Sequence, residues 1–393
     1  MAAEKSAYSG PVILAGGYRV FFPLAALWAV ASLLVWISFL YLEQELGFNI
    51  DMFQWHAHSL VFGYGGAVVA GFALTAIPNW TGRSPVRGWG LVVLVLPWLG
   101  ARFVEILLLV DYDLELIRFG SEMIFYVLFL TVAAREVLLG KNWRNLKIVV
   151  VFGLLTASAL AANLVRLNLI DLSFSGPVLG LSVLLLLITI IGGRIIPAFT
   201  ANWLRGKGKT DLPVMFNRFD GVAIVVAAGV LAAFLAGAEG LIFAAACGLA
   251  ALLHFARLAR WKGVHTTTSP IVFVLHVSYL WVPIGFVLMG ASSLGLLPQN
   301  AAVHAWAVGG IGSTTLAVMS RASLGHAGLP LADSALLSSI YAAINLAALL
   351  RITAFFWLGH YNLLVQLSAL FWCVAFLLSL WRFIPLVFAK RQS

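Results

Sequence analysis

The sequence predicts an all-α polytopic membrane protein with about twelve transmembrane helices. Hydrophobic residues make up 62% of the 393-residue chain and charged residues only 10%, and the mean hydropathy is +1.01. Apolar runs of roughly twenty residues, enough to cross the hydrocarbon core of a bilayer, recur along the whole chain. Basic residues gather in alternate loops between these runs, which is typical of a multi-pass membrane protein.

The apolar runs give the order of the predicted helices. They begin near Tyr18, Trp55, Trp89, Leu114, Leu146, Pro177, Phe219, Gly240, Pro270, Ala301, Ala335 and Leu363. We place the boundary between the seventh and eighth helices at residues 237–240, where two glycines interrupt a long apolar stretch. No loop is long enough for a soluble domain. We therefore expect a single transmembrane domain over residues 1–393, with a short cytoplasmic arm (1–17) and a basic cytoplasmic loop at about 199–218.

The loop charges predict the orientation of the chain, because cytoplasmic loops carry an excess of Lys and Arg. Basic residues follow the even-numbered helices: Arg83, Arg87, Arg135, Lys141, Arg144, Lys147, Arg194, Arg205, Lys207, Lys209, Arg218, Arg257, Arg260, Lys262, Arg382, Lys390 and Arg391. The opposite loops carry Glu43, Glu45, Asp51, Asp111, Asp113, Asp171 and Glu239. Both termini are therefore predicted to be cytoplasmic, and the net charge of +9 does not indicate nucleic-acid binding.

Targeting and cysteine signals narrow the class further. The first fifteen residues contain Glu4 and Lys5 and no apolar core, so we expect no cleavable signal peptide. Cys247 and Cys373 both fall inside predicted helices, which argues against a disulfide. The sequence contains no Cys-x-x-Cys-His motif, so covalent c-type haem attachment is excluded.

A weak internal echo links the second, sixth and tenth helices. Their predicted cytoplasmic ends carry similar residues: Pro78-Asn79-Trp80, then Pro197 with Asn202-Trp203, then Gly325 and Gly328 with Pro330. A threefold repeat of four helices would produce this spacing. The alternative is that Pro, Gly and Asn simply mark helix ends.

Two histidines at the start of the second helix are the most informative feature of the chain. An ionisable group in a membrane span is a functional-site hypothesis, and imidazole is the commonest protein metal ligand. His56 and His58 are two residues apart, so on one helix they point in nearly opposite directions and only one can ligate a given metal. We favour His58 as a haem axial ligand, with His56 as its supporting partner or the alternative ligand. A pair of interfacial histidines beside Trp55 is the other interpretation.

His304, near the start of the tenth helix, should lie at a depth similar to that of His58. A haem with two imidazole ligands could therefore sit between the second and tenth helices. Small residues follow each histidine: Gly63, Gly65 and Gly66, and Gly309, Gly310 and Gly312. They would admit a flat macrocycle, or equally another helix.

Four arginines break the orientation pattern, because they fall in or near the outer half of the predicted membrane: Arg102, Arg118, Arg166 and Arg351. One explanation is pairing with acidic residues such as Glu105 or Glu122. The other is that they hold the propionates of a haem. The sequence leaves both open.

A second, inner metal site is also conceivable from the histidine distribution. His276 lies about two turns from the cytoplasmic end of the ninth helix, and His326 follows Met319 at the inner end of the tenth. Met is a soft ligand suited to copper. We interpret His254 and His265 as solvated loop residues and His360 as interfacial.

Several motifs together resemble the NnrS family. They are Gly17-Tyr18-Arg19-x-Phe21-Phe22, Trp55-His56-Ala57-His58, Pro78-Asn79-Trp80-Thr81-Gly82, Asn142-Trp143-Arg144-Asn145, Gly193-Arg194-x-x-Pro197-Ala198-Phe199-Thr200 and Arg321-x-Ser323-Leu324-Gly325-His326-x-Gly328. The resemblance spans nearly the whole chain. It implies a twelve-helix protein of the bacterial inner (cytoplasmic) membrane that binds haem and copper and is associated with denitrification and relief of nitrosative stress. No catalytic residue is implied.

A fainter resemblance is to the catalytic subunit of the haem-copper oxidases. It implies three four-helix arcs and a haem between the second and tenth helices. The predicted sixth and seventh helices contain no histidine, and the tenth contains only His304, so the binuclear reductase site of those enzymes is not expected here.

The sequence thus favours a membrane protein with haem b, and by resemblance copper, that acts on or protects against nitric oxide. If it is an enzyme, it is an oxidoreductase. Its expected partners are the lipid bilayer, nitric oxide, and quinone or another electron donor. The alternative function is a secondary transporter or permease that uses membrane histidines as proton or substrate sites.

Overall fold

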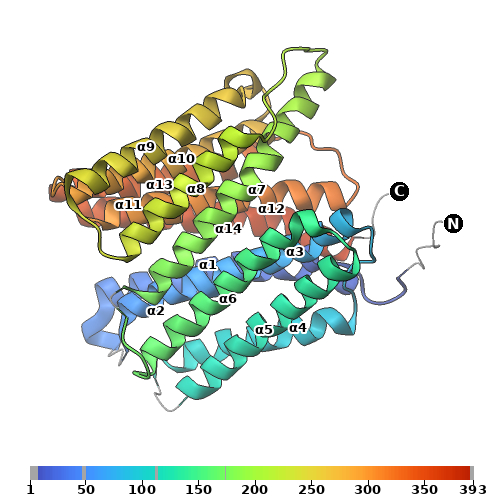
Figure 1. The fold of residues 1–393 in the computed structure, drawn as a ribbon. Helices are drawn as coiled ribbons and strands as arrows, with labels where there is room; N and C mark the ends of the chain where they lie inside the picture. Colours follow the sequence, from blue (N-terminus) through green and yellow to red (C-terminus); the bar gives the residue numbers. More distant parts are fainter. Residues whose placement is uncertain (1–7, 47–49, 111–113, 173, 390–393) are drawn as a thin grey trace. The chain divides into compact units, whose positions relative to one another are not determined.

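The computed structural model describes residues 8–46, 50–110, 114–172 and 174–389. Within them the chain is all helical, with twelve membrane-scale helices and no strand (Figure 1). Glu4, Lys5, Asp111, Asp113, Lys390 and Arg391 lie outside the described residues.

Ten of the twelve contain no π segment: α1 (Gly17–Leu46), α4 (Trp89–Leu107), α5 (Glu115–Leu139), α6 (Leu146–Arg166), α7 (Gly176–Gly206), α8 (Arg218–Leu235), α9 (Gly240–Arg260), α10 (Pro270–Ser293), α13 (Ala335–Phe356) and α14 (Tyr361–Phe388). Their starts lie within a few residues of the predicted positions. The predicted boundary between the seventh and eighth helices is confirmed, because α8 ends at Leu235 and α9 begins at Gly240.

Eleven helices are long and apolar enough to cross a membrane. The twelfth, α5, is 25 residues long and would reach roughly 37 Å at helical rise. It carries five charged residues: Glu115, Arg118, Glu122, Arg135 and Glu136. The chain is therefore a multi-pass membrane protein whose most charged long helix needs a polar lining of its own.

The remaining two membrane helices each contain a π-helical segment. One consists of α2 (Met52–His58), the π segment η2 (Ser59–Tyr64) and α3 (Gly65–Thr81). The other consists of α11 (Asn300–His304), the π segment η5 (Ala305–Ser313) and α12 (Thr314–His326). In both helices the residue just before the π segment is a histidine. Such segments frequently occur at functional sites.

Side chains satisfy the backbone carbonyls that the π segment η2 exposes. Trp28 Nε1 donates to Ser59 O at 3.1 Å, Trp98 Nε1 to Gly63 O at 3.0 Å, and the Tyr126 hydroxyl to Phe62 O at 2.8 Å. Because an unpaired carbonyl is costly in an apolar interior, these donors help to maintain the irregular segment.

Contacts within the chain divide it into two compact units. Unit 1 comprises residues 1–180, 322–330 and 380–393, and unit 2 comprises residues 181–321 and 331–379. In unit 1, α1 packs on α3, and α5 packs on α4 and α6. In unit 2, α10 packs on α9, η5 and α13, and α8 packs on α9. Both units are built from transmembrane helices.

The start of α1 and the end of α14 lie together in unit 1. Arg19, 4% exposed, directs Nη1 at three carbonyls near the end of α14, those of Leu386 (2.6 Å), Val387 (2.9 Å) and Ala389 (2.9 Å). A cation at a helix C-terminus satisfies its unpaired carbonyls. The start of α1 and the end of α14 therefore face the same side, as expected for two termini in one compartment.

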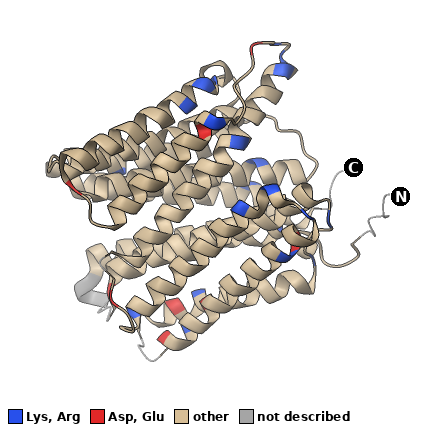
Figure 2. Cartoon of the chain, in the orientation of Figure 1, with Lys and Arg blue, Asp and Glu red and all other residues tan. Residues whose placement is uncertain are grey.

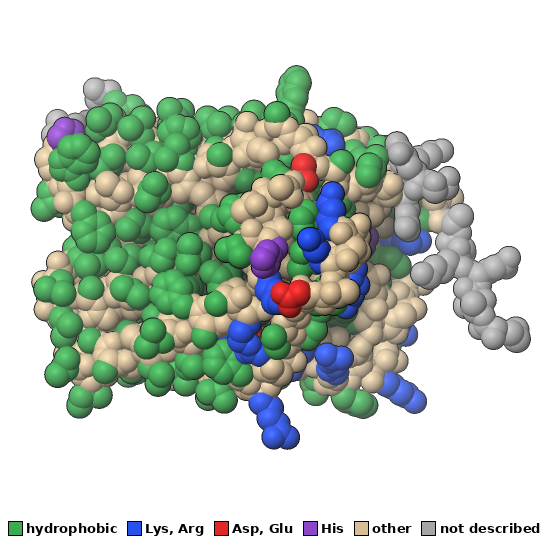
Figure 3. Space-filling view, turned by 90° about the horizontal axis from the view of Figure 1, so that it is seen from above, with side chains coloured by type: hydrophobic (Ala, Val, Ile, Leu, Met, Phe, Trp, Pro, Cys, Tyr) green, Lys and Arg blue, Asp and Glu red, His purple; other side chains and the backbone are tan. Residues whose placement is uncertain are grey.

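In unit 1, the Lys and Arg residues outside the helices gather at the end where α3 and α5 finish, and in unit 2 they gather at the end where α7 and α9 finish (Figure 2). We call each of these the basic end of its unit. Apolar side chains cover most of the face seen in Figure 3, with basic side chains toward one end. Ile242, for example, is 88% exposed and Trp89 81%, as expected for helices that face lipid.

The helix-end markers behave differently from the expectation. Pro78 lies inside α3 and Pro197 inside α7, so neither proline marks a helix end. A π segment occurs in the second and tenth membrane helices, but α7, the sixth, has none. Cys247 and Cys373 are buried free thiols, which confirms the absence of a disulfide among the described residues.

Candidate functional site

His58 lies at the junction between α2 and the π segment η2. Asp51 begins this helix, because its carboxylate accepts hydrogen bonds from the backbone of Phe53 and Gln54, each at 3.0 Å. The His58 side chain is buried at 2% exposure. Its Nε2 atom lies 2.7 Å from Glu122 Oε2.

Glu122, on α5, is the centre of a buried polar cluster. Its Oε1 accepts a hydrogen bond from Arg102 Nη2 at 2.6 Å, and its Oε2 accepts one from Asn163 Nδ2 at 2.8 Å. Arg118 Nη1 lies 3.4 Å from the same oxygen, and Arg118 Nη2 donates to Asn163 Oδ1 at 2.6 Å. Four helices, α2, α4, α5 and α6, thus direct polar groups at one carboxylate.

Two further carboxylates complete the cluster. Glu105 lies 2.7 Å from Arg102 Nη1 and accepts a hydrogen bond from Ser59. Glu115 accepts from Arg118 Nε at 2.8 Å and pairs with Arg166. We call this set the unit 1 cluster: His58, Ser59, Arg102, Glu105, Glu115, Arg118, Glu122, Asn163 and Arg166. Three arginines face three glutamates, so the cluster is electrically balanced when His58 is neutral.

The acidic alternative from the sequence therefore holds for three of the four outer arginines. Buried charges are tolerated when they are paired and hydrogen-bonded, and Arg118 and Glu105 are each 0% exposed. These glutamates already pair with the three arginines that the haem propionates would otherwise bind. Iron ligation through Nε2 of His58 would require this ring to leave Glu122.

His304 occupies the equivalent position before the π segment η5 and has different surroundings. Its Nδ1 donates to the carbonyl oxygen of Asn300, one turn earlier, at 2.8 Å. A hydrogen bond of this kind fixes the tautomer and leaves the lone pair on Nε2, as in many metal-ligating histidines. The ring is half-buried and lies 6.0 Å from the Phe355 ring.

Arg351, on α13, lies on the same phenylalanine. Its guanidinium carbon is 4.5 Å from the Phe355 ring centre and 5.7 Å from that of Tyr361. Nη2 lies 3.4 Å from the Tyr361 hydroxyl, and Nη1 is buried without a hydrogen-bond partner. Within the described residues no carboxylate forms an ion pair with Arg351, in contrast to Arg102, Arg118 and Arg166.

Aromatic side chains occupy the space beside the glycines of both π segments. A Cβ atom at Gly63 would collide with Trp28 and Arg102. One at Gly309 would collide with Trp281. The sequence predicted that these glycines make room for a macrocycle or a neighbouring helix. In the structure the room beside them is filled by indole rings and a guanidinium.

The residues proposed for an inner copper site are divided between the units. His276, on α10, and Met319, on α12, belong to unit 2, whereas His326 belongs to unit 1. His276 Nε2 lies 2.8 Å from the Thr200 hydroxyl, and the His326 ring contacts the Tyr18 ring, with 5.4 Å between ring centres. No group of three or more His, Cys, Asp or Glu residues in the described parts of the chain could hold a metal ion. Copper stays a prediction.

The other histidines divide as follows. His56 stacks on Trp36 at 4.5 Å, which resembles the interfacial interpretation. His265 and His360 are exposed, as expected. The expectation for His254 is wrong, because α9 extends to Arg260 and carries His254 as a fully buried helical residue.

His254 belongs to a polar cluster in unit 2 that sequence reasoning missed. Its Nδ1 lies 2.8 Å from the Tyr279 hydroxyl, and Arg257 Nη1 donates to the same hydroxyl at 2.5 Å. Arg257 Nε in turn donates to Asp220 at 2.9 Å. The one available signal was the spacing of His254 and Arg257, which puts both side chains on one helical face.

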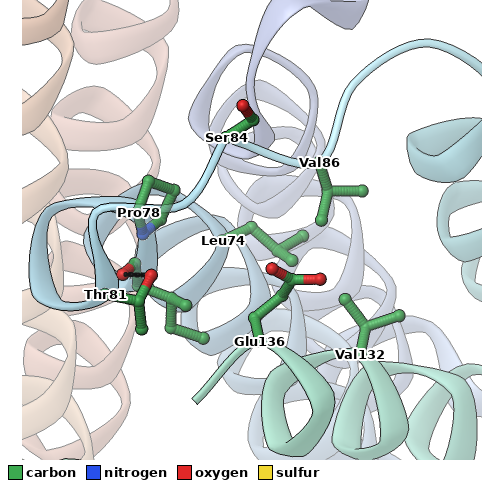
Figure 4. A pocket seen from close by; sticks show the side chains of 8 residues that line it. Leu74, Pro78, Thr81, Ser84, Val86, Val132 and Glu136 are labelled. Carbon is green, nitrogen blue, oxygen red and sulfur yellow. Dashed lines mark hydrogen bonds between the residues drawn. The ribbon is translucent and has the colours of Figure 1, made fainter. Parts of the chain in front are cut away.

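A small apolar pocket lies at the basic end of unit 1 (Figure 4). It is lined by Leu74, Ile77, Pro78, Thr81, Ser84, Val86, Val132 and Glu136. Glu136 accepts from Arg83 Nε at 2.5 Å, and this hydrogen bond and charge raise the pKa of the Arg83 guanidinium. Nearby, the Asn142 amide donates to the carbonyl of Trp80, so two of the motifs behind the family resemblance meet here.

Comparison with known families agrees with the resemblance seen in the sequence. The family model described as NnrS protein matches residues 12–391, nearly the whole chain. The chain belongs to the NnrS family. No curated protein matches it. NnrS membership associates the chain with nitric oxide, and the NnrS motif Trp55-His56-Ala57-His58 leads directly into the π segment beside the unit 1 cluster.

Proposed function

We propose that this chain binds haem b in the bacterial inner membrane and acts in nitric-oxide metabolism or resistance to nitrosative stress. Family membership supports the link to nitric oxide. The observation that carries the haem proposal is that His304 and Arg351 both lie beside the ring of Phe355. One offers an imidazole with a fixed tautomer, and the other offers a buried guanidinium nitrogen without a partner.

These residues fit the polar requirements of a haem. His304 would supply Nε2 as an axial ligand, and Arg351 would hold a propionate through a charge-assisted hydrogen bond. A bound haem would supply one-electron chemistry and, with an open coordination position, a site for nitric oxide. An enzyme of this kind would be an oxidoreductase, and quinone is our proposed electron donor.

The unit 1 cluster fits a haem less well. His58 Nε2 faces Glu122, and each nearby arginine already has a carboxylate partner. His58, with His56 as alternative, remains our proposal for a second axial ligand, and copper with His276, His326 and Met319 remains a proposal for a second metal.

The unit 1 cluster also favours the alternative function, a secondary transporter. Buried ionisable residues inside a membrane bundle frequently mark proton relays or substrate sites. Under this alternative, Glu122 and His58 would bind a proton or a cationic solute, and His304 would bind no haem.

The test is an absorption spectrum of the chain, purified after incubation with haemin and removal of unbound haemin. We expect a Soret band that His304→Ala removes or shifts, while His360→Ala, which alters another histidine of unit 2 that is exposed, leaves it unchanged. Loss of the band in His58→Ala would make His58 the second ligand. If the folded chain shows no Soret band after incubation with haemin, the haem proposal is overturned and transport is favoured. Metal analysis of His276→Ala and His326→Ala tests copper separately.

A further inference from the structure

Five buried rings form a continuous chain within unit 2. Trp261 contacts Tyr279 (4.6 Å between ring centres), Tyr279 contacts His254 (5.9 Å), His254 stacks on Phe286 (5.8 Å), and Phe286 contacts Trp306 (5.1 Å). Each ring is at most 1% exposed. This chain of rings is therefore shielded from water and lipid over its whole length.

The two ends of the ring chain are at functionally distinct places. Trp261 directly follows α9 at the basic end of unit 2. Trp306 lies in the π segment η5, two residues after His304. The rings thus connect the neighbourhood of the proposed haem ligand with the basic end of unit 2.

At Tyr279 and His254, in the middle of the ring chain, the direction of the hydrogen bonds is defined. A guanidinium can only donate, so Arg257 Nη1 donates to the Tyr279 oxygen. The phenolic hydrogen is then available for His254 Nδ1, which lies 2.8 Å away. Asp220 (2.9 Å) and the carbonyl of Thr189 (3.1 Å) fix the guanidinium in turn.

We propose that this ring chain carries single electrons through unit 2, with Tyr279 and His254 as its proton-coupled relay. When a one-electron oxidant removes an electron from Tyr279, the phenolic O–H bond breaks and its proton moves to His254 Nδ1. A neutral tyrosyl radical and an imidazolium result. Return of one electron to Tyr279 and of the proton from His254 restores the pair. Trp261 and Trp306 are the oxidisable rings at the ends.

Packing alone does not account for these residues. A phenol, an imidazole and an ion pair buried together are costly unless every group is hydrogen-bonded. Phenylalanine and leucine would fill the same volume in a membrane bundle without that cost. Tyr126 in unit 1 provides the contrast, because its hydroxyl donates to the backbone carbonyl of Phe62 and not to an imidazole.

The physiological use of this path rests on the proposed haem near His304, but its test does not. Val264, 76% exposed and three residues after Trp261, is changed to Cys and labelled with a ruthenium photo-oxidant. The native Cys247 and Cys373 are buried. A flash with an external electron acceptor then generates the oxidant at the basic end, and transient absorption and electron paramagnetic resonance identify the radical.

We expect a tyrosyl radical in the labelled parent. Tyr279→Phe should abolish it and leave a tryptophanyl signal, whereas the matched control Tyr126→Phe should retain it. His254→Leu should slow tyrosyl formation by roughly 100-fold, the lower range for loss of a general base, and deuterated water should slow the parent.

Circular dichroism and gel filtration check that each variant folds. An unchanged tyrosyl signal in Tyr279→Phe, or no tyrosyl radical in a folded labelled parent, would overturn the relay. Neither outcome depends on whether the chain binds haem.

Discussion

The two helices with π segments share a framework and differ in what surrounds it. In each, a histidine precedes the π segment and a glycine follows five residues later, Gly63 after His58 and Gly309 after His304. A tryptophan from the preceding membrane helix packs beside each glycine. Trp28 on α1 packs beside Gly63, and Trp281 on α10 packs beside Gly309.

The polar groups around these segments are of opposite kinds. Beside η2 lies the charged unit 1 cluster. Beside η5, the hydroxyls of Ser278 and Ser313 lie 2.5 Å apart, and Asn345 accepts from Trp281 Nε1 at 3.0 Å. This set is neutral, and Arg351, which lies beside the same phenylalanine as His304, has no carboxylate partner among the described residues. The shared backbone feature thus supports an internally neutralised cluster in unit 1 and an unneutralised cation in unit 2.

The largest effect should come from the shared carboxylate of unit 1. Glu122→Ala removes the partner of Arg102, Arg118 and His58, and loss of one member of a buried ionic network costs about 3–5 kcal/mol. Thermal unfolding in detergent measures the change. Glu239→Ala, in an exposed loop, should stay within about 0.5 kcal/mol of the parent. An equally small effect in Glu122→Ala would mean that the cluster is not paired as described.

Arg351→Gln should affect haem binding and not stability, because no ion pair is lost. We expect little change in the stability of the haem-free chain. Haem affinity should fall by about 1.5–3 kcal/mol, the usual value of a hydrogen bond to a charged group. Haemin titration followed by absorbance gives this value.

Arg118→Gln provides the contrasting result: we expect a large loss of stability, while the proposed haem contacts of His304 and Arg351 stay in place. If Arg351→Gln destabilises the chain as strongly as Arg118→Gln, the contrast between a neutralised and an unneutralised arginine is wrong.

The glycines should respond alike in both units. Gly63→Ala and Gly309→Ala each introduce a methyl group that collides with an indole ring, and overpacking typically costs about 1–3 kcal/mol. Gly120→Ala is the matched control, since nothing lies within 4 Å of its Cβ position in α5. It should stabilise the helix by up to about 1 kcal/mol. Thermal unfolding in detergent measures all three, and a difference between the two π-segment glycines would show that the frameworks are not equivalent.

Helix number and placement followed from the sequence because hydropathy responds directly to the bilayer. The positions of His58 and His304 at the starts of two membrane helices were predicted for the same reason. The π segments were not, because they depend on donors such as Trp28 and Trp98 from other helices. Hydropathy alone also misplaced His254, since the polar run that follows it looks like a loop. In the structure α9 continues through this run, and the tertiary hydrogen bond with Tyr279 holds the buried His254 side chain.

The pairing of the outer arginines was open in the sequence and could only be settled by tertiary structure. Arg102 meets Glu105 at i,i+3, which sequence spacing allows, but Arg166 and Glu115 come from α6 and α5. Within the described residues, no carboxylate at any sequence spacing pairs with Arg351. Charge pattern along the chain therefore identifies which arginines are unusual, and only the fold shows which of them are neutralised.

The smallest effect should come from the neutral set beside η5. Ser313→Ala leaves the buried Ser278 hydroxyl without its partner and should cost about 1 kcal/mol, well below Glu122→Ala. The double variant Ser278→Ala/Ser313→Ala should recover part of that loss, because no unpaired hydroxyl remains. Thermal unfolding in detergent measures both, with the exposed Ser338→Ala as control. A loss in Ser313→Ala as large as in Glu122→Ala would show that neutral and charged surroundings support a π segment equally.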